Sequence, residues 1–121
     1  PMTVRAIRGA IQIESDHPEL MKEAVVELVS KILESNRLEA ADLISVLFTC
    51  TPDLVSDFPA ASARSMGLEL VPLLCAVEMA VPGSLPRTIR VLVHCNTSLE
   101  QNEISHIYLR GAVTLRKDIA Q

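Results

Sequence analysis

An arginine and a glutamate lie within apolar segments that otherwise predict β-strands. Glu78 is near the end of LVPLLCAVEM, residues 70–79, and Arg90 is near the start of TIRVLVHCN, residues 88–96. Solvent is the cheaper place for a charged side chain, so each position needs an explanation. A salt bridge between neighbouring strands is one explanation, worth about 0.2–1 kcal/mol. A binding site that requires both charges is the other, and the strand pattern leaves the two open.

Arginine dominates the basic residues, with eight Arg against three Lys. Its planar guanidinium is suited to partly buried, bidentate recognition of carboxylates. Several Arg with one Glu predict a pocket for a small polycarboxylate. The sequence shows no evident nucleophile–base pair, so such a pocket would act by positioning the ligand and by electrostatics aimed at developing charge.

Composition argues against several other functions. The net charge of -4 and the three aromatic residues do not favour nucleic-acid binding. We expect no membrane span, since no apolar run reaches the required length, and PMTVRAIRGA lacks the organisation of a signal peptide. Three cysteines without CxxC spacing suggest reduced thiols and a cytoplasmic protein. The histidines lack metal-ligand spacing and there is no glycine-rich phosphate loop, so we expect no metal and no cofactor.

Periodicity predicts a single mixed α/β domain over residues 1–121, with helices on one face of a sheet. Asp16 followed by Glu19 resembles a capping box at the start of the main helix. The chain has too few helices to cover the other sheet face, so we expect self-association there. The predicted strands are 3–13, 44–50, 70–79, 88–96 and 107–116, and the predicted helices are 17–35, 39–43 and 58–67, with one or two helical turns in SLEQNEISH.

Five segments together carry a resemblance that covers essentially the whole chain. They are AIRGAI (6–11), TPDLVSDFPAASAR (51–64), VPLLCAVEM (71–79), VPGSLPRTIRV (81–91) and HIYLRGAVTLR (106–116). In this order and spacing the sequence resembles the monofunctional chorismate mutases of the trimeric α/β class. The resemblance implies a homotrimer that packs its sheets into a pseudo-α/β-barrel, with active sites at the subunit interfaces. It also implies the Claisen rearrangement of chorismate to prephenate in phenylalanine and tyrosine biosynthesis, without a cofactor or a covalent intermediate.

The resemblance also implies roles for individual residues. Arg90 would be the main catalytic contact, to the ether oxygen and a carboxylate, and Glu78 would bind the ring hydroxyl and face the electron-poor ring fragment. Further substrate contacts within the same subunit would be Arg8 and Tyr108 at a carboxylate, Cys75 at the hydroxyl, Leu73 and Leu74 at the wall, and Leu115 and Arg116 at the mouth. The neighbouring subunit would contribute Arg64, Phe58 and Ala60.

The sequence departs from the family at Ala61, where members often carry Lys. We expect weaker substrate capture there, and a less ordered closing segment because the tail past Lys117 is short. Two alternatives stay open at this point: a trimeric imine-deaminase-like enzyme, and a trimeric protein that binds a small carboxylate without turnover. Glu78 with Arg90 in this motif context favours the mutase.

Overall fold

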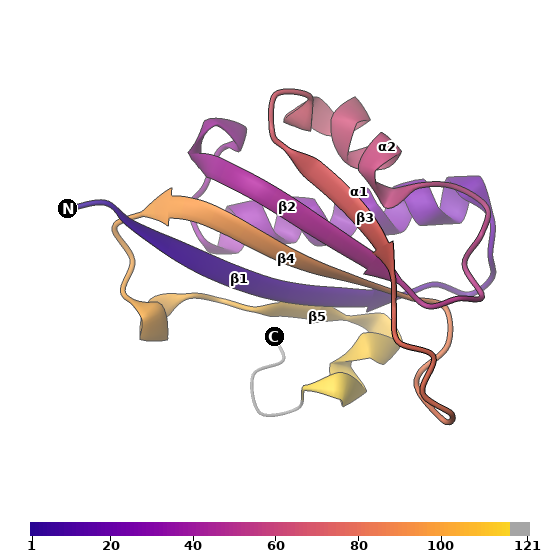
Figure 1. The fold of residues 1–121 in the computed structure, drawn as a ribbon. Helices are drawn as coiled ribbons and strands as arrows, with labels where there is room; N and C mark the ends of the chain where they lie inside the picture. Colours follow the sequence, from indigo (N-terminus) through magenta and orange to yellow (C-terminus); the bar gives the residue numbers. More distant parts are fainter. Residues whose placement is uncertain (117–121) are drawn as a thin grey trace.

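The chain forms one five-stranded mixed sheet in a computed structural model that describes residues 1–116 (Figure 1). The strand order is β3-β2-β4-β1-β5. The long strand β4 is antiparallel to β1 on one side and to β2 on the other, while β3 and β5 pair in parallel at the two edges. The strand bounds are β1 Thr3–Gln12, β2 Leu43–Cys50, β3 Leu73–Val77, β4 Thr88–Thr97 and β5 Ile107–Leu109.

Two helices cover one face of this sheet, as expected. In Figure 1 the helix α1 runs behind the strands, and α2 lies beyond the β3 edge. The main core between sheet and helices is aliphatic except for Phe48, which is fully buried. The helical bounds are α1 Pro18–Ser35, η1 Ala40–Asp42, α2 Pro59–Ala63, a π-turn η2 Arg64–Leu68, η3 Gln101–Glu103 and η4 Arg110–Leu115. The predicted order of strands and helices is therefore confirmed.

The start of α1 differs from the capping box that we expected. The cap is His17, whose Nδ1 accepts a hydrogen bond from the Glu19 N–H at 3.2 Å. Asp16 instead accepts from the N–H groups of Val55 and Ser56, at 3.0 and 3.1 Å. Those loop donors hold the carboxylate away from the helix, so Asp16 joins two segments instead of capping one.

The last strand was predicted over 107–116 but ends at Leu109. Arg110 has a φ of 55°, in the left-handed region, which stops the extended conformation. Its Nη2 donates to Glu27 Oε1 on α1 at 2.7 Å, which anchors the turn. The chain then continues as η4, which buries Ala112 against Ala10 and Tyr108, so the prediction of a strand beyond Leu109 was wrong.

The edge strand β3 is also shorter than the predicted 70–79. Pro72 has no N–H to donate, and its carbonyl accepts from Val46 at 3.0 Å where β3 is about to begin. At the other end Glu78 lies just past the strand, although its N–H still donates to the carbonyl of Cys50 at 2.8 Å. Glu78 is thus held on the β2–β3 ladder by its backbone.

The sheet face opposite α1 is only partly covered. A small buried cluster of Ala10, Tyr108 and Ala112 packs η4 onto β1 and β5. Elsewhere on this face apolar side chains remain exposed, including Leu74 of β3, of which 64% is accessible. Within residues 1–116, no helix has the length and apolar character needed to cross a membrane. The expectations for the tail at 117–121 fall outside the described residues.

Candidate active site

Strand pairing places four side chains in a row on the sheet face opposite α1. Thr49 of β2 is paired with Arg90 of β4, Arg90 with Ala10 of β1, and Ala10 with Tyr108 of β5. Successive strand residues point to opposite faces, and the neighbours of Arg90 on β4 are buried against α1. The charged group is on this face because the other face is filled by the core.

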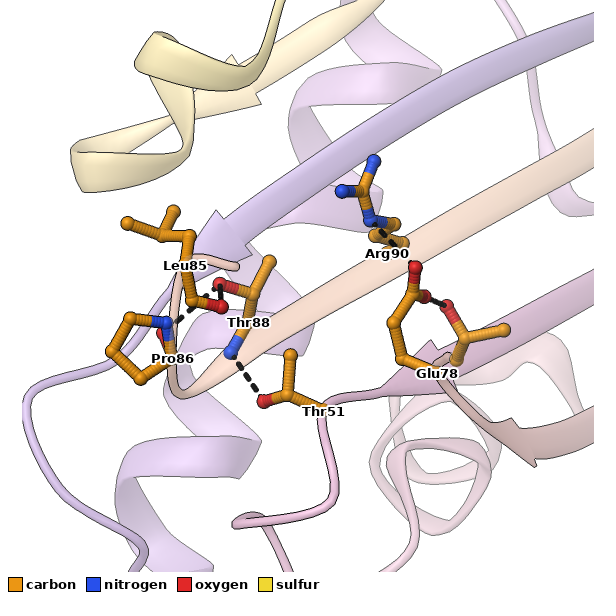
Figure 2. Close-up of polar contacts among 7 residues, drawn as sticks. Thr51, Glu78, Leu85, Pro86, Thr88 and Arg90 are labelled. Carbon is orange, nitrogen blue, oxygen red and sulfur yellow. Dashed lines mark hydrogen bonds and ion pairs between the residues drawn. The ribbon is translucent and has the colours of Figure 1, made fainter. Parts of the chain in front are cut away.

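Glu78 reaches the same row from the end of β3. Its Oε2 lies 3.1 Å from Arg90 Nε, and its Oε1 accepts a hydrogen bond from the Thr49 hydroxyl. Within residues 1–116 Arg90 Nε makes no hydrogen bond despite this short distance, so its contact to Glu78 is an ion pair without a well-directed N–H. Figure 2 shows the two terminal nitrogens of Arg90 pointing away from Glu78. The predicted salt bridge therefore exists, and it leaves the outer edge of the guanidinium for another partner.

A cavity of about 240 Å³ opens beside Arg90. It brings together the side chains of four residues that the resemblance implied, Arg8, Arg90, Tyr108 and Arg116. The lining is completed by Gly9, Leu47, Thr49, Val91 and Leu92. Three guanidinium groups with one neighbouring carboxylate give this hollow a positive balance, which suits a ligand with two negative charges.

His106, which directly precedes β5, supports the backbone of Arg8 beside the cavity. The Arg8 N–H donates to His106 Nδ1 at 3.0 Å. Burial lowers the pKa of His106, and the guanidinium groups of Arg8 and Arg116 lower it further. The imidazole is therefore neutral at pH 7, which preserves its acceptor nitrogen and adds no charge beside the two arginines.

The loop between Glu78 and Arg90 is tied down at its base (Figure 2). The Thr88 N–H donates to the Thr51 hydroxyl at 3.0 Å, and the Thr88 hydroxyl donates to the carbonyls of Leu85 and Pro86. The Arg87 N–H donates to both oxygens of Asp53, at 3.2 and 3.0 Å. These bonds fix the start of β4, so Arg90 is held on rigid backbone.

Eight of the implied residues do not line this cavity, although one of them, Glu78, contacts Arg90. The other seven lie elsewhere in the fold. Arg64 and Phe58 are exposed on the α2 side, and Ala60 is buried there. Four others were expected to reach the substrate from the same subunit. Leu73 and Cys75 pack against the main core. Leu74 is exposed on the open face, and Leu115 packs beside Tyr108. Ala61 lies on α2, also outside the cavity.

Two of the three cysteines, Cys50 and Cys95, are unsuited to nucleophilic chemistry. Burial and the neighbouring Cys75 raise the pKa of the Cys50 thiol to about 12, and burial also raises that of Cys95. These two thiols are protonated at neutral pH, and a protonated thiol is a poor nucleophile. Among residues 1–116 there is no cluster of three or more His, Cys, Asp or Glu side chains that could hold a metal ion.

Sequence reasoning missed Thr49. Its hydroxyl binds Glu78 and its side chain lines the cavity. The alternation of residues 44–50 would have placed it on one face with Leu47, but only the pairing of β2 with β4 shows that this face meets Arg90. The register between distant strands was the missing information.

The chain is similar in sequence or structure to three proteins that are named chorismate mutase. Residues 4–119 match the family described as chorismate mutase type I. The chain is 52% identical to chorismate mutase AroH of Thermus thermophilus, over 96% of both chains. It is 38% identical to chorismate mutase AroH of Bacillus subtilis, over 98% of this chain and 94% of that one.

A solved structure agrees with the sequence comparisons. Chorismate mutase from Clostridium thermocellum superposes with a TM-score of 0.90 at 41% identity, covering 91% of this chain and 98% of that one. The likeness thus extends over most of the chain. A match over nearly all residues in both sequence and fold shows that the chain belongs to the chorismate mutase type I family.

Proposed function

We infer that this protein is a chorismate mutase that converts chorismate to prephenate for phenylalanine and tyrosine biosynthesis. The observation that carries the inference is Arg90, which lines a cavity together with two further arginines. Glu78 lies against its Nε, and its terminal nitrogens point away from Glu78. Chorismate is a dicarboxylate with a ring hydroxyl and an ether oxygen. A site of this charge suits it without a metal, nucleophile or cofactor.

The mechanism follows from where charge changes during the rearrangement. The C–O bond of the ether breaks as a C–C bond forms, so negative charge grows on the ether oxygen and the ring fragment becomes electron-poor. In our proposal a terminal N–H of Arg90 donates to that oxygen, and the Glu78 carboxylate binds the ring hydroxyl and faces the ring. Donors fixed before the reaction stabilise the transition state more than the ground state.

Carboxylate binding selects the reactive shape of the substrate. Arg8 and Tyr108 hold a carboxylate in this proposal, and Arg116 closes over the mouth with Leu115. Holding both ends of a flexible molecule converts a rare folded conformer into the bound one, which lowers the entropic part of the barrier. The contacts proposed for Cys75, Leu73 and Leu74, by backbone or side chain, form the hydroxyl side and the wall.

The neighbouring subunit completes the site in this proposal, and the assembly is a homotrimer. Support comes from the open sheet face with its exposed apolar side chains, and from Phe58, of which 68% is accessible in the single chain. Arg64, Phe58 and Ala60 of one copy would cover the cavity of the next. A cytoplasmic location suits the three free cysteines.

Loss of chorismate, followed by ultraviolet absorbance, tests the function directly. We expect purified protein to consume chorismate and yield prephenate. No turnover by folded protein would overturn the proposed activity, and a titration with prephenate would then show whether the chain only binds a small carboxylate. Conversion of an imine substrate instead would favour the imine-deaminase alternative.

Mixing two inactive variants tests the shared site. Arg90→Ala and Arg64→Ala chains, unfolded together and refolded, should regain activity in about one site in four. A site that takes Arg90 from one chain and Arg64 from the next is intact only when each of those two chains carries the unmutated residue. Activity that stays at the level of the separate variants would show that both residues serve the same site from one chain.

A further inference from the structure

We propose that Thr49 is a positioning residue, which orients the Glu78 carboxylate for the reaction. This inference rests on the proposed function. The Thr49 hydroxyl bonds the Glu78 carboxylate. Thr49 also lines the cavity and is paired in register with Arg90.

Glu78 needs such a support because of its place in the fold. It lies just past the end of β3, at the edge of the sheet, and 24% of its side chain is accessible. A glutamate has several freely rotating bonds, so in this position its carboxylate could turn to solvent. Its contact to Arg90 is an ion pair that lacks a directed hydrogen bond, so that contact does not fix the orientation of the carboxylate plane.

Thr49 supplies the missing directional contact. Its hydroxyl donates to Oε1, which turns Oε2 toward Arg90. Thr49 is β-branched and sits within β2, between β3 and β4, so both its side-chain torsion and its backbone are restrained. The carboxylate therefore takes its orientation from a central strand, although Glu78 itself is at the edge.

Removing the hydroxyl should affect the reaction more than the fold. In Thr49→Val, which keeps the shape, Glu78 loses its hydrogen bond and samples other orientations. Losing a hydrogen bond to a charged group changes a rate or an equilibrium constant by about tenfold or more. We therefore expect kcat to fall by about tenfold, with a smaller change in KM. Thr49→Ser keeps the hydroxyl and should restore most of kcat.

The matched control is Ser45→Ala. Ser45 lies on the same strand, but its hydroxyl bonds His94 Nδ1 at 3.2 Å and it does not line the cavity. This variant should keep wild-type kcat. A fall like that of Thr49→Val would assign the effect to the strand in general and overturn the proposal.

A double-mutant cycle tests whether Thr49 acts through Glu78. If it does, Thr49→Val should cost about tenfold in the wild type but less than about twofold in a Glu78→Ala background. An equal loss in both backgrounds, or no loss in the wild type, would refute the proposal. Wild-type turnover in the same assay separates a failure of the proposed function from a failure of this inference. If the wild type is inactive, the proposed function fails. If the wild type is active and Thr49→Val is unaffected, only the role of Thr49 fails.

Discussion

Replacing Arg90 by lysine keeps the charge and removes the geometry, which makes it a demanding test of the mechanism. In the structure Nε faces Glu78 while two terminal nitrogens point away from it. A lysine has a single ammonium, which can pair with Glu78 or reach the substrate but cannot hold both positions. We therefore expect Arg90→Lys to be nearly as defective as Arg90→Ala.

The size of the effect follows from the hydrogen bonds that each substitution removes. Removing one donor aimed at developing charge costs about 10²–10³ in kcat. Removing a charge-assisted bond to a carboxylate costs about 1.5–3 kcal/mol more. Arg90→Ala should thus lower kcat/KM by about 10³–10⁵, and Arg90→Lys by about 10²–10⁴. Glu78, deprived of its counter-ion, would also repel the anionic substrate.

Steady-state kinetics on chorismate, with kcat and KM determined separately, measure these effects. Arg37→Lys is the matched control, because Arg37 is exposed and does not line the cavity. It should keep the wild-type kcat/KM. Near-normal kcat/KM in a correctly folded Arg90→Lys protein would refute the reasoning, because charge alone would then be sufficient.

Three other predictions concern the support of the site. Asn36 is buried and makes three hydrogen bonds, to the carbonyls of residues 32 and 105 and from the N–H of Ser105, so Asn36→Ala should lower the free energy of unfolding by about 2–4 kcal/mol in denaturant titrations. A side-chain carbon at Gly9 would lie 2.9 Å from a β5 carbonyl, so Gly9→Ala should destabilise by about 1–3 kcal/mol and lower the Tm. The pKa of His106 is lower in the folded chain than its unfolded value of 6.5. The contribution of the neutral imidazole to the free energy of unfolding is therefore fully present above pH 6.5 and is lost as the pH falls through the folded pKa. His106→Gln should remove this part of the pH dependence, and unchanged acid sensitivity would contradict it.

The sequence predicted the sheet and its order of elements because those signals are local. In residues 88–96 the neighbours of Arg90 are apolar and alternate with it, and the structure places those neighbours in the core. Where local signals compete with distant partners the predictions were wrong, as at Asp16, which bonds the loop after β2, and at Arg110, which bonds α1.

The candidate site was predictable only in part. The five-segment resemblance named Arg8, Arg90, Tyr108 and Arg116, and the fold places all four around one cavity. Thr49 could not be found in this way, because its meaning depends on the register of β2 against β4. The contacts proposed for Arg64 and Phe58 depend on a second chain, and they stay predictions.

The pairing of β1 with β5 has a consequence for the order of events in folding. The bond from Arg8 to His106 joins residues 98 positions apart, and between them lies nearly the whole sheet. Contacts of such long sequence separation form late, since chain entropy must be lost before they can form. In a refolding chain, helix content should therefore return before enzymatic activity. A chain still emerging from the ribosome would have α1 and most of β1 exposed to solvent long before it could recognise a substrate.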